Sequence, residues 1–487
     1  MNRREFLQNT AGVVAAAGAV HGLEVKGQGA AHAVEAWPEN GTLIPDEGWR
    51  LWVDQKAEWK QDVIFLPEDV SQTADGVVRG KGEPLPVNAP MGGWAVLSGA
   101  ASGSVPVTLP GSVEQHFWGK FGAGADGKPR PYLAEEYRYA PDDPVPLNGA
   151  YFGVSWWWRE IEIPASMQGK RIFLHVRGAH LRAEVYLNEK LVGYSIMEEL
   201  PFEAELTHAA KPSGKNVLAI RITNPWGRFD WVDGLNEQWG AVKIYRSHGF
   251  GGLDRGMTIS AVADDGARFL DAWVLNAPEP QTVQVHARVL TPLLAGHISA
   301  PTEQLLSFLK VEVVDPRGGK LVSSRVVKQD VGGEDAELDY TVTLRCDGVE
   351  LWDLHSPRLY HLRLIYQTKD AREDDRTIAF GFRSFAPEGL GSNALFRLNG
   401  RRMKIYTSIS WGYWGINGMW PTPELAEKEV TQAKKLNLTC LDFHRNLAKE
   451  DVLRAHDRLG LLRYMEPGAG KMAIGRLPSG VAASANS

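Results

Sequence analysis

The sequence predicts a multidomain, mainly β protein in which two β-sandwiches precede the start of a (β/α)8 barrel. Residues 153–223 carry short strands with period-two alternation, separated by turn residues at roughly ten-residue spacing. Residues 257–385 carry a second run of such strands. Residues 402–465 then read as strand, helix, strand, helix, strand, which is typical of parallel β/α units. A chain of 487 residues is long enough for about three such domains.

Composition narrows the class of protein. Charged residues make up 23% and the hydrophobic set 44%, as in ordinary globular domains. The net charge of −6 argues against a nucleic-acid partner, because phosphate binding needs clustered Lys and Arg. Seventeen Trp residues suit either stacking on sugar rings or the filling of sandwich cores. No stretch beyond the N-terminus is long and apolar enough for a membrane helix.

The first 33 residues are predicted to be a bacterial twin-arginine export signal. Arg3 and Arg4 precede a weakly apolar stretch, residues 11–20, which is too short to span a bilayer. Residues 31–33 (Ala-His-Ala) offer a cleavage site, and residues 17–19 are a rival. The alternative is a chance Arg-Arg pair at a disordered N-terminus. We therefore expect a periplasmic or extracellular protein, free of the membrane once the signal is cleaved.

Cysteine usage and short motifs predict neither a disulfide nor a bound cofactor. Cys346 and Cys440 fall in different predicted domains, so they are not expected to pair, and two thiols allow no thiol-metal pattern. No calcium loop, H-E-x-x-H motif or phosphate-cradling Gly loop is present. The expected metal and cofactor content is none.

The first domain is assigned to residues 34–256. Residues 34–150 are rich in Pro, Gly and Trp with little periodicity, although residues 105–112 look like a strand running into a turn. The strands of residues 153–223 include a hairpin turned at residues 188–190. This spacing predicts a β-sandwich or jelly roll.

The second domain, residues 257–385, suits an immunoglobulin-like sandwich. Trp352 and Tyr360 are expected in its core rather than in a site, and residues 380–383 read as its last strand. Arg383 is a candidate for an interdomain ion pair.

The third domain, residues 386–487, is predicted to be the start of a (β/α)8 barrel. Strands are expected at residues 402–408, 438–443 and 461–465, with a helix capped at Thr422-Pro423-Glu424 and another over residues 449–458. Because a complete barrel takes roughly 250 residues, only about three of its eight strands are expected here.

Several short motifs follow one another along the chain. They are Val107-Thr108-Leu109-Pro110-Gly111-Ser112, Trp157-Trp158-Arg159, residues 183–193, Gly251-Gly252-Leu253-Asp254-Arg255, Leu351-Trp352 with Pro357-Arg358-Leu359-Tyr360, Phe380-Gly381-Phe382-Arg383, Phe396-Arg397-Leu398-Asn399-Gly400 and residues 457–462. In this order they resemble glycoside hydrolase family 2, the β-galactosidase, β-glucuronidase and β-mannosidase group. The resemblance covers about residues 100–470 and implies that the first domain is a galactose-binding-like, sugar-binding jelly roll.

The resemblance implies retaining hydrolysis of β-glycosidic bonds by two carboxylates, one acting as acid/base and the other as nucleophile. In the family these are Glu residues ending the fourth and seventh barrel strands. The Asn-Glu pairs of this chain, Asn188-Glu189 and Asn236-Glu237, lie in or beside the first sandwich and cannot be carried over. No catalytic residue of the family is therefore expected within these 487 residues.

Substrate-binding candidates follow the three predicted barrel strands, because barrel sites lie at the strands' carboxyl ends. Packing, capping or ion pairing remains an alternative for each, and Asp442 stands where the family has Arg, which leaves the sugar open. The candidates are Trp411, Tyr413 and Trp414 after the first strand, His444 and Arg445 after the second, Glu466 at the third, and Asp230 and Asp233 on a loop of the first domain.

Two functions fit the sequence, both with carbohydrate as the partner and with the oligomeric state open. The first is an exported family 2 glycosidase, present here as a fragment that is inactive by itself. The second is a non-catalytic carbohydrate-binding or scaffold protein, for which the barrel remnant would have become polar. The apolar residues Leu438, Leu441, Leu461 and Leu462 favour the first function.

Overall fold

The computed structural model describes most of the chain between Gly41 and Arg476. Residues 1–40, which include the predicted export signal, and residues 477–487 lie outside the described residues. So do residues 60–61, 74–75, 99–102, 118–150, 152, 197–199, 225–235, 240–241, 246–249, 264–265, 292–305, 331–336, 369–371, 390, 392–393, 411–419, 444–447 and 466–472.

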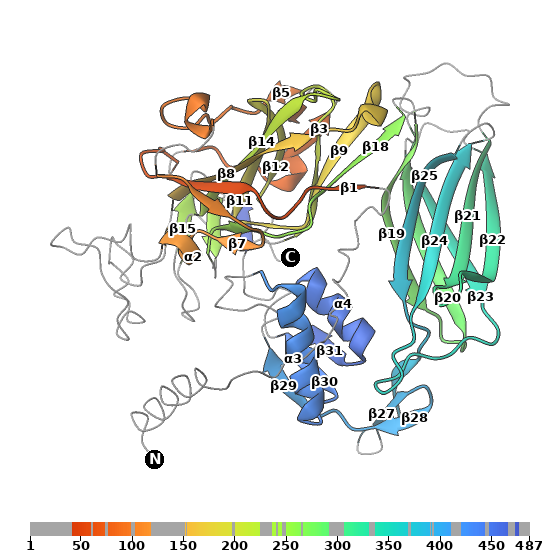
Figure 1. Ribbon diagram of the computed structural model, residues 1–487. Helices are drawn as coiled ribbons and strands as arrows, with labels where there is room; N and C mark the ends of the chain where they lie inside the picture. The colour runs from red at the N-terminus through yellow and green to blue at the C-terminus, as the bar shows by residue number, and fades with distance from the viewer. Residues whose placement is uncertain are drawn as a thin grey trace, which may run out of the picture. The chain divides into compact units, whose positions relative to one another are not determined.

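Two antiparallel sheets form the first sandwich (Figure 1), with the orders β12-β11-β14-β8-β2-β6 and β1-β18-β9-β13. Apolar side chains of both sheets, among them Trp157, Leu174 and Ile220, share one core. Strand β18 lies beyond residue 256, where the sequence placed the end of the first domain. The strands are β1 (Thr42–Leu43), β2 (Trp49–Asp54), β6 (Val105–Val107), β8 (Gly153–Glu162), β9 (Lys170–Val176), β11 (Arg182–Leu187), β12 (Lys190–Ser195), β13 (Phe202–Glu205), β14 (Lys215–Asn224) and β18 (Thr258–Ala263).

Short elements complete this part of the chain. A three-stranded sheet joins β10 (Ala179–His180), β17 (Gly252–Leu253) and β7 (Gly111–Ser112), followed by the one-turn helix α2 (Glu114–Phe117). The predicted hairpin turn is confirmed between β11 and β12: Asn188 and Glu189 have φ values of 50° and 71°, as a tight two-residue turn requires.

The outer face of the six-stranded sheet is also buried, which the period-two pattern did not predict. Trp156 and Trp158 point away from the first core, yet they are buried against apolar residues of the segment 64–97, including Phe65 and Leu97. That segment consists of very short elements, so it shows no periodicity in sequence. They are η1 (Pro67–Asp69), β3 (Val70–Thr73), β4 (Gly76–Arg79), β5 (Glu83–Pro84) and η2 (Trp94–Leu97).

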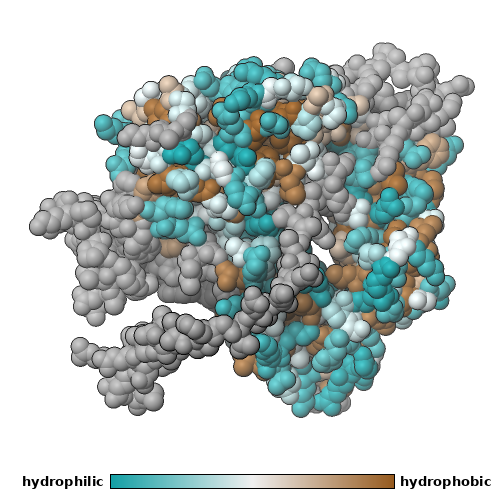
Figure 2. Space-filling view, in the orientation of Figure 1, coloured by the Kyte–Doolittle hydropathy of each residue, from teal (hydrophilic) through white to brown (hydrophobic). Residues whose placement is uncertain are grey.

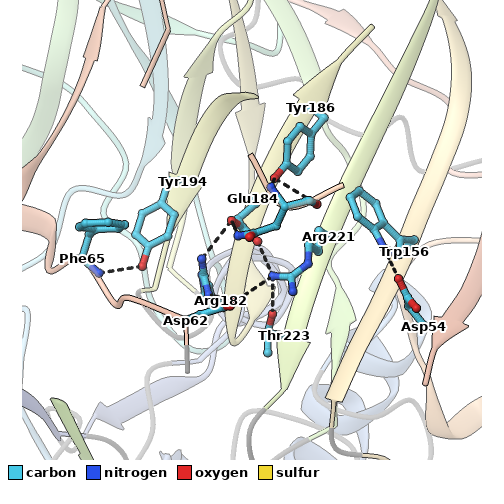
Figure 3. A network of polar contacts seen from close by, with 11 residues as sticks. Asp54, Asp62, Phe65, Trp156, Arg182, Glu184, Tyr186, Tyr194, Arg221 and Thr223 are labelled. Carbon is cyan, nitrogen blue, oxygen red and sulfur yellow. Dashed lines mark hydrogen bonds and ion pairs between the residues drawn. The ribbon is translucent and has the colours of Figure 1, made fainter. Parts of the chain in front are cut away.

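A buried ionic network ties Asp62, just before this covering segment, to the sheet (Figure 3). Arg182 lies 2.6 Å from Asp62 and 3.0 Å from Glu184. Arg221 lies 2.5 Å from the other carboxylate oxygen of Glu184 and donates to Thr223. Because the two guanidinium groups meet two carboxylates, the charges are compensated inside the fold. We interpret this network as structural.

The second sandwich pairs the sheets β19-β20-β23 and β22-β21-β24-β25. Tyr360 lies in its core as predicted, 3% exposed, and Trp352 is equally buried. The guanidinium of Arg383 lies over the Trp352 ring, 5.5 Å from its centroid. The strands are β19 (Arg268–Asn276), β20 (Thr282–Leu290), β21 (Leu306–Asp315), β22 (Lys320–Asp330), β23 (Glu337–Arg345), β24 (Tyr360–Thr368) and β25 (Arg372–Phe380).

The predicted alternation of strands and helices is confirmed in the last segment. Three parallel strands, β29 (Thr407–Ser410), β30 (Cys440–Phe443) and β31 (Leu462–Met465), form a sheet in chain order. Helix α3 (Pro423–Lys435) connects the first two, and α4 (Glu450–Leu459) connects the last two. Figure 2 shows a mainly hydrophilic surface where these helices face the viewer, as expected for amphipathic helices.

The strand predicted over residues 402–408 is wrong. The chain instead forms β28 (Arg401–Met403), which closes an antiparallel sheet with β26 (Phe385–Glu388) and β27 (Leu395–Leu398), and then starts β29. Asn399 and Gly400 turn the chain between β27 and β28 with positive φ. A further antiparallel sheet joins β15 (Asn236–Trp239), β16 (Val242–Tyr245) and β32 (Ala473–Arg476).

Local signals fix both helices. The hydroxyl of Thr422 accepts a hydrogen bond from the Leu425 N–H at 3.3 Å, so the predicted cap is confirmed. Helix α4 ends at Gly460, whose φ of 77° favours glycine. No helix of the described residues is long and apolar enough to cross a membrane. Cys346 and Cys440 are both buried and free.

Candidate functional site

The carboxyl ends of the three parallel strands meet at one edge. Ser410 of β29, Phe443 of β30 and Met465 of β31 stand side by side in register. In β/α barrels the functional loops leave the strands at this end. We therefore take this edge, with the side chains around it, as the candidate site.

All eight predicted site residues lie outside the described residues, so their roles stay predictions. The structure fixes only where their segments begin. Those after β29, β30 and β31 leave the sheet from the same edge, and the loop of the first domain leaves from the end of β14. The residues are Trp411, Tyr413, Trp414, His444, Arg445, Glu466, Asp230 and Asp233.

Sequence reasoning missed a serine–carboxylate pair at this edge. The Ser410 hydroxyl donates to Oε1 of Glu429 on α3, at 2.7 Å. Burial raises the pKa of Glu429, and the bond from Ser410 only partly opposes this. The other carboxyl oxygen is buried without a hydrogen-bond partner among the described residues. In the sequence, the sign of this pair was that the acidic residue Glu429 stands next to the apolar positions of α3 that are buried, Ala426, Val430 and Ala433.

The two faces of the parallel sheet differ. Leu441 and Phe443 pack against both helices in one apolar cluster. On the opposite face, Ile409, Asp442 and Tyr464 form one row across the three strands. Ile409 is 61% exposed and Tyr464 59% exposed. The described residues thus cover the sheet on the helix side but not on the side that would face a barrel interior.

The start of helix α4 contacts the first sandwich. The Lys449 ammonium lies 4.3 Å from the centroid of the buried Trp420 ring. The indole nitrogen of Trp420 in turn lies 2.9 Å from the position that a Cβ on Gly252 would occupy. That Cβ would also lie 2.3 Å from the Gly111 carbonyl oxygen. A glycine is therefore needed at residue 252 for this close approach.

Five charged residues extend the same contact. Arg177 after β9 lies 2.9 Å from Glu450 and 3.2 Å from Asp451, the first two residues of α4. Its distance to Asp254 is 3.9 Å, and Arg255 lies 3.5 Å from Asp451. Carboxylates in the first turn of a helix also meet the positive end of its dipole. These ion pairs therefore hold the N-terminal end of α4 against the first sandwich.

Burial and neighbouring charges together shift the pKa values of Arg177 and Asp254. Burial opposes the charge of Arg177, but Asp254, Glu450 and Asp451 outweigh it and raise the pKa of the guanidinium. Burial raises the pKa of Asp254 to about 6, with Arg177 lowering it and Asp451 raising it. Among the described residues, no group of three or more His, Cys, Asp or Glu side chains is arranged to hold a metal ion.

The other end of α4 contacts the second sandwich. The Trp352 indole N–H donates to the carbonyl oxygen of Asp457 at 2.7 Å. The Lys434 ammonium at the end of α3 donates to the Leu354 carbonyl at 2.6 Å. A Cβ on Gly460 would lie only 2.6 Å from that same oxygen. Helix α4 is therefore anchored to both sandwiches, one at each end.

Comparison with curated proteins finds glycosidases. The chain is 23% identical over 340 residues to a β-galactosidase of Bacteroides ovatus, a match that covers 68% of this chain and 36% of the relative. It is 21% identical over 316 residues to a protein of Formosa agariphila described as a putative β-glucuronidase, covering 64% and 27%. The chain thus spans about a third of the length of these relatives. No family model matches it.

Solved structures share the fold. A glycosyl hydrolase family 2 member from Bacteroides cellulosilyticus superposes with a TM-score of 0.59 at 18% identity, covering 87% of this chain and 45% of that one. A β-glucuronidase of Bacteroides uniformis superposes with a TM-score of 0.56 at 16% identity, covering 88% of this chain and 43% of that one. A β-glucuronidase of Ruminococcus gnavus superposes with a TM-score of 0.57 at 17% identity, covering 89% of this chain and 60% of that one.

The sheets and these likenesses define the class of protein as a multidomain, mainly β chain with the architecture of glycosidases. Within this class, the chain is related to glycoside hydrolase family 2. This is the family that the order of sequence motifs indicated.

Proposed function

We propose that these residues belong to an exported, retaining glycosidase of family 2 type that cleaves β-glycosidic bonds in oligo- or polysaccharides. Residues 34–256 would be its sugar-binding jelly roll, residues 257–385 its immunoglobulin-like sandwich, and residues 386–487 the first part of its catalytic barrel. The support comes from the glycosidase relatives and from the order of the sheets, antiparallel pairs followed by three parallel strands.

The uncovered face of the parallel sheet carries this proposal. Parallel sheets are normally buried on both faces, but Ile409 and Tyr464 are more than half exposed on the face away from the helices. The matched relatives are also much longer than the match. We propose that further β/α units pack against this face in the active enzyme. Those units would also carry the acid/base and the nucleophile, whose carboxyl groups must lie roughly 5–5.5 Å apart.

The proposal predicts that the 487-residue chain alone does not hydrolyse glycosides. The purified chain is assayed on aryl β-galactoside, β-glucuronide and β-mannoside, and no turnover above buffer is expected. The same assay on a polypeptide extended by the downstream reading frame of the gene should show turnover. Turnover by the 487-residue chain that a single Glu or Asp substitution abolishes would show that the active site lies within it.

Export is a separate part of the proposal. Arg3 and Arg4 precede a weakly apolar stretch, as in substrates of the twin-arginine route, which carries folded proteins. Replacing both with Lys should leave a fused reporter in the cytoplasm, whereas the unchanged signal should deliver it to the periplasm. Equal delivery of both fusions contradicts the signal assignment.

The second candidate is a non-catalytic carbohydrate-binding or scaffold protein. It requires a β/α segment that is finished without further strands, with polar side chains on its open face. Asp442 is polar, but Ile409 beside it is apolar and 61% exposed, and Leu441 and Leu461 remain buried in an apolar cluster. A stable, inactive product of the extended gene that still binds carbohydrate would favour this candidate.

A further inference from the structure

The outer face of the sheet β19-β20-β23 carries an exposed tryptophan. Trp273 of β19 is 43% exposed, and its indole is stacked on the imidazole of His286 in β20, with ring centroids 5.0 Å apart and planes 10° apart. The imidazole is itself held in place, because its Nδ1 lies 3.2 Å from the hydroxyl of Thr341 in β23. One row across the three strands thus presents an aromatic ring in a fixed orientation.

The fold does not need Trp273 for its core. Neighbouring residues on the same strands point to the other face, where Val285 and Val342 are almost completely buried in the core of the second sandwich. Side chains of a strand alternate between its two faces. The ring of Trp273 therefore stands on the outward side of the sheet.

Polar side chains surround the aromatic pair. In the next row toward one end of the strands, Leu275, Gln284 and Thr343 lie in register, and Leu275 is 52% exposed. In the row toward the other end, Asp271, Arg288 and Asp339 lie in register and are exposed. Gln284, Arg288, Thr343 and Asp339 belong to β20 and β23, on the side of the indole that His286 covers, whereas Asp271 and Leu275 flank Trp273 along its own strand, β19.

We propose that this face binds a neutral carbohydrate, with a pyranose ring stacked on Trp273. The C–H face of a sugar is apolar and its hydrogens are attracted to the negative face of an aromatic ring. The carboxylate of Asp271, two residues before Trp273 on the same face of β19, offers acceptors for the hydroxyl groups at the sugar's rim. This site lies outside the β/α segment and needs no catalytic residue, so it goes beyond the proposed function.

Two other occupants fit this face less well. A protein interface usually buries at least roughly 1,200 Å² in total, with an apolar centre, but Trp273 and Leu275 are the only exposed large apolar residues on the described strands of this face. An anionic ligand would meet Asp271, Asp339 and Glu337, and Arg288 already lies 3.7 Å from Glu337. A hydroxyl-rich, uncharged ligand matches the mixture of groups best.

Affinity electrophoresis of the full chain tests the site. Native gels contain soluble galactomannan, xyloglucan or β-1,4-galactan, with polygalacturonate as the anionic comparison. We expect slower migration in at least one neutral polysaccharide, and for Trp273→Ala a weakening of binding on the order of tenfold. Trp273→Phe should retain part of the binding because it keeps an aromatic face. The matched control is Phe396→Ala, since Phe396 is also 43% exposed but lies on β27.

Any of three outcomes would overturn the proposal. The first is unchanged migration of the wild-type chain in every polysaccharide, and the second is equal retardation of the wild type and Trp273→Ala. The third is self-association that Trp273→Ala abolishes in sedimentation velocity, which would assign the face to a second copy of the chain. None of these outcomes depends on hydrolysis, so failure here leaves the glycosidase proposal to its own assay.

Discussion

The guanidinium group of Arg177 lies 3.2 Å from the carboxylate of Asp451, although one belongs to the first sandwich and the other starts helix α4. At the opposite end of the same helix, the Trp352 indole donates to the Asp457 carbonyl. Helix α4 is therefore held by both sandwiches. It connects β30 to β31, whose carboxyl ends form part of the candidate site. Substitutions at either end of the helix are expected to loosen it.

Removal of Arg177 should destabilise the chain and loosen α4. The variant Arg177→Ala leaves Glu450, Asp451 and Asp254 without their shared cation, and breaking a buried ion pair from one side costs about 3 kcal/mol. Urea unfolding measures the loss, and hydrogen exchange should place it in residues 450–459. The control is Arg79→Ala, because Arg79 and Glu83 form an exposed pair of little expected value. Equal effects of the two variants contradict the anchoring role.

Gly460 should tolerate alanine far worse than Gly400. Both have φ values near 77°, where a Cβ is strained by roughly 1–2 kcal/mol. A Cβ at Gly460 would also lie 2.6 Å from the Leu354 carbonyl oxygen, whereas one at Gly400 would meet nothing within 4 Å. Thermal unfolding should show a larger loss for Gly460→Ala by about 2 kcal/mol or more. Similar losses would mean that α4 does not pack tightly on the second sandwich.

Glu114 should make the chain less stable as pH rises. Burial raises its pKa to about 8, although the Tyr151 N–H donates to it and opposes the shift. The folded chain therefore holds the proton more tightly than the unfolded chain. The contribution of Glu114 to stability is fully present below pH 4.5 and is lost, by up to about 5 kcal/mol, as pH rises to 8.

The variant Glu114→Gln isolates this contribution. The difference in unfolding free energy between variant and wild type should grow in favour of the variant from pH 6.5 to 8. Over that interval Asp254, with a pKa of about 6, and His456, with one of about 4, contribute little change. Glu160→Gln is the matched control, because Glu160 is exposed and pairs with exposed Lys215. A parallel pH dependence of wild type and Glu114→Gln would sink the assignment.

The open edges of the parallel sheet should appear in hydrogen exchange. Strand β30 has neighbours on both sides, whereas β29 and β31 each have one neighbour among the described strands. Edge positions with exposed side chains open more readily. We expect the amides of β29 and β31 to exchange at least tenfold faster than those of β30. Uniform protection across the three strands would instead mark a finished domain and favour the non-catalytic candidate.

Sequence patterns predicted those parts of the fold whose signals are local. The Asn188-Glu189 turn and the Thr422 cap each depend on a few adjacent residues, and both are confirmed. The burial of Trp156 and Trp158 was missed because their cover comes from short elements without periodicity. The first parallel strand was misplaced because the sequence of residues 401–410 is continuously strand-like, whereas the chain forms β28, leaves the strand conformation at residues 404–406 and pairs anew in β29.

The site was harder to predict than the fold. Residue type and spacing identify the strand ends, but the Ser410–Glu429 pair depends on how α3 packs against β29. The anchoring of α4 likewise joins Arg177, Arg255 and Asp451, which no local pattern connects. Charged residues meet at such contacts through tertiary structure, so a single sequence gives little indication of them.

The pairing of β1 with β18 has a consequence for how the chain is made on the ribosome. Thr42 lies opposite Ile259, so the first sandwich cannot acquire its complete edge until residue 259 has been synthesised. Chains grow from the N-terminus, and contacts between distant segments form late. The ion pairs of Arg177 with α4 form later still, after the residues that begin α4 have left the exit tunnel. In a nascent chain the guanidinium group of Arg177 therefore lacks Glu450 and Asp451 until those residues have been synthesised.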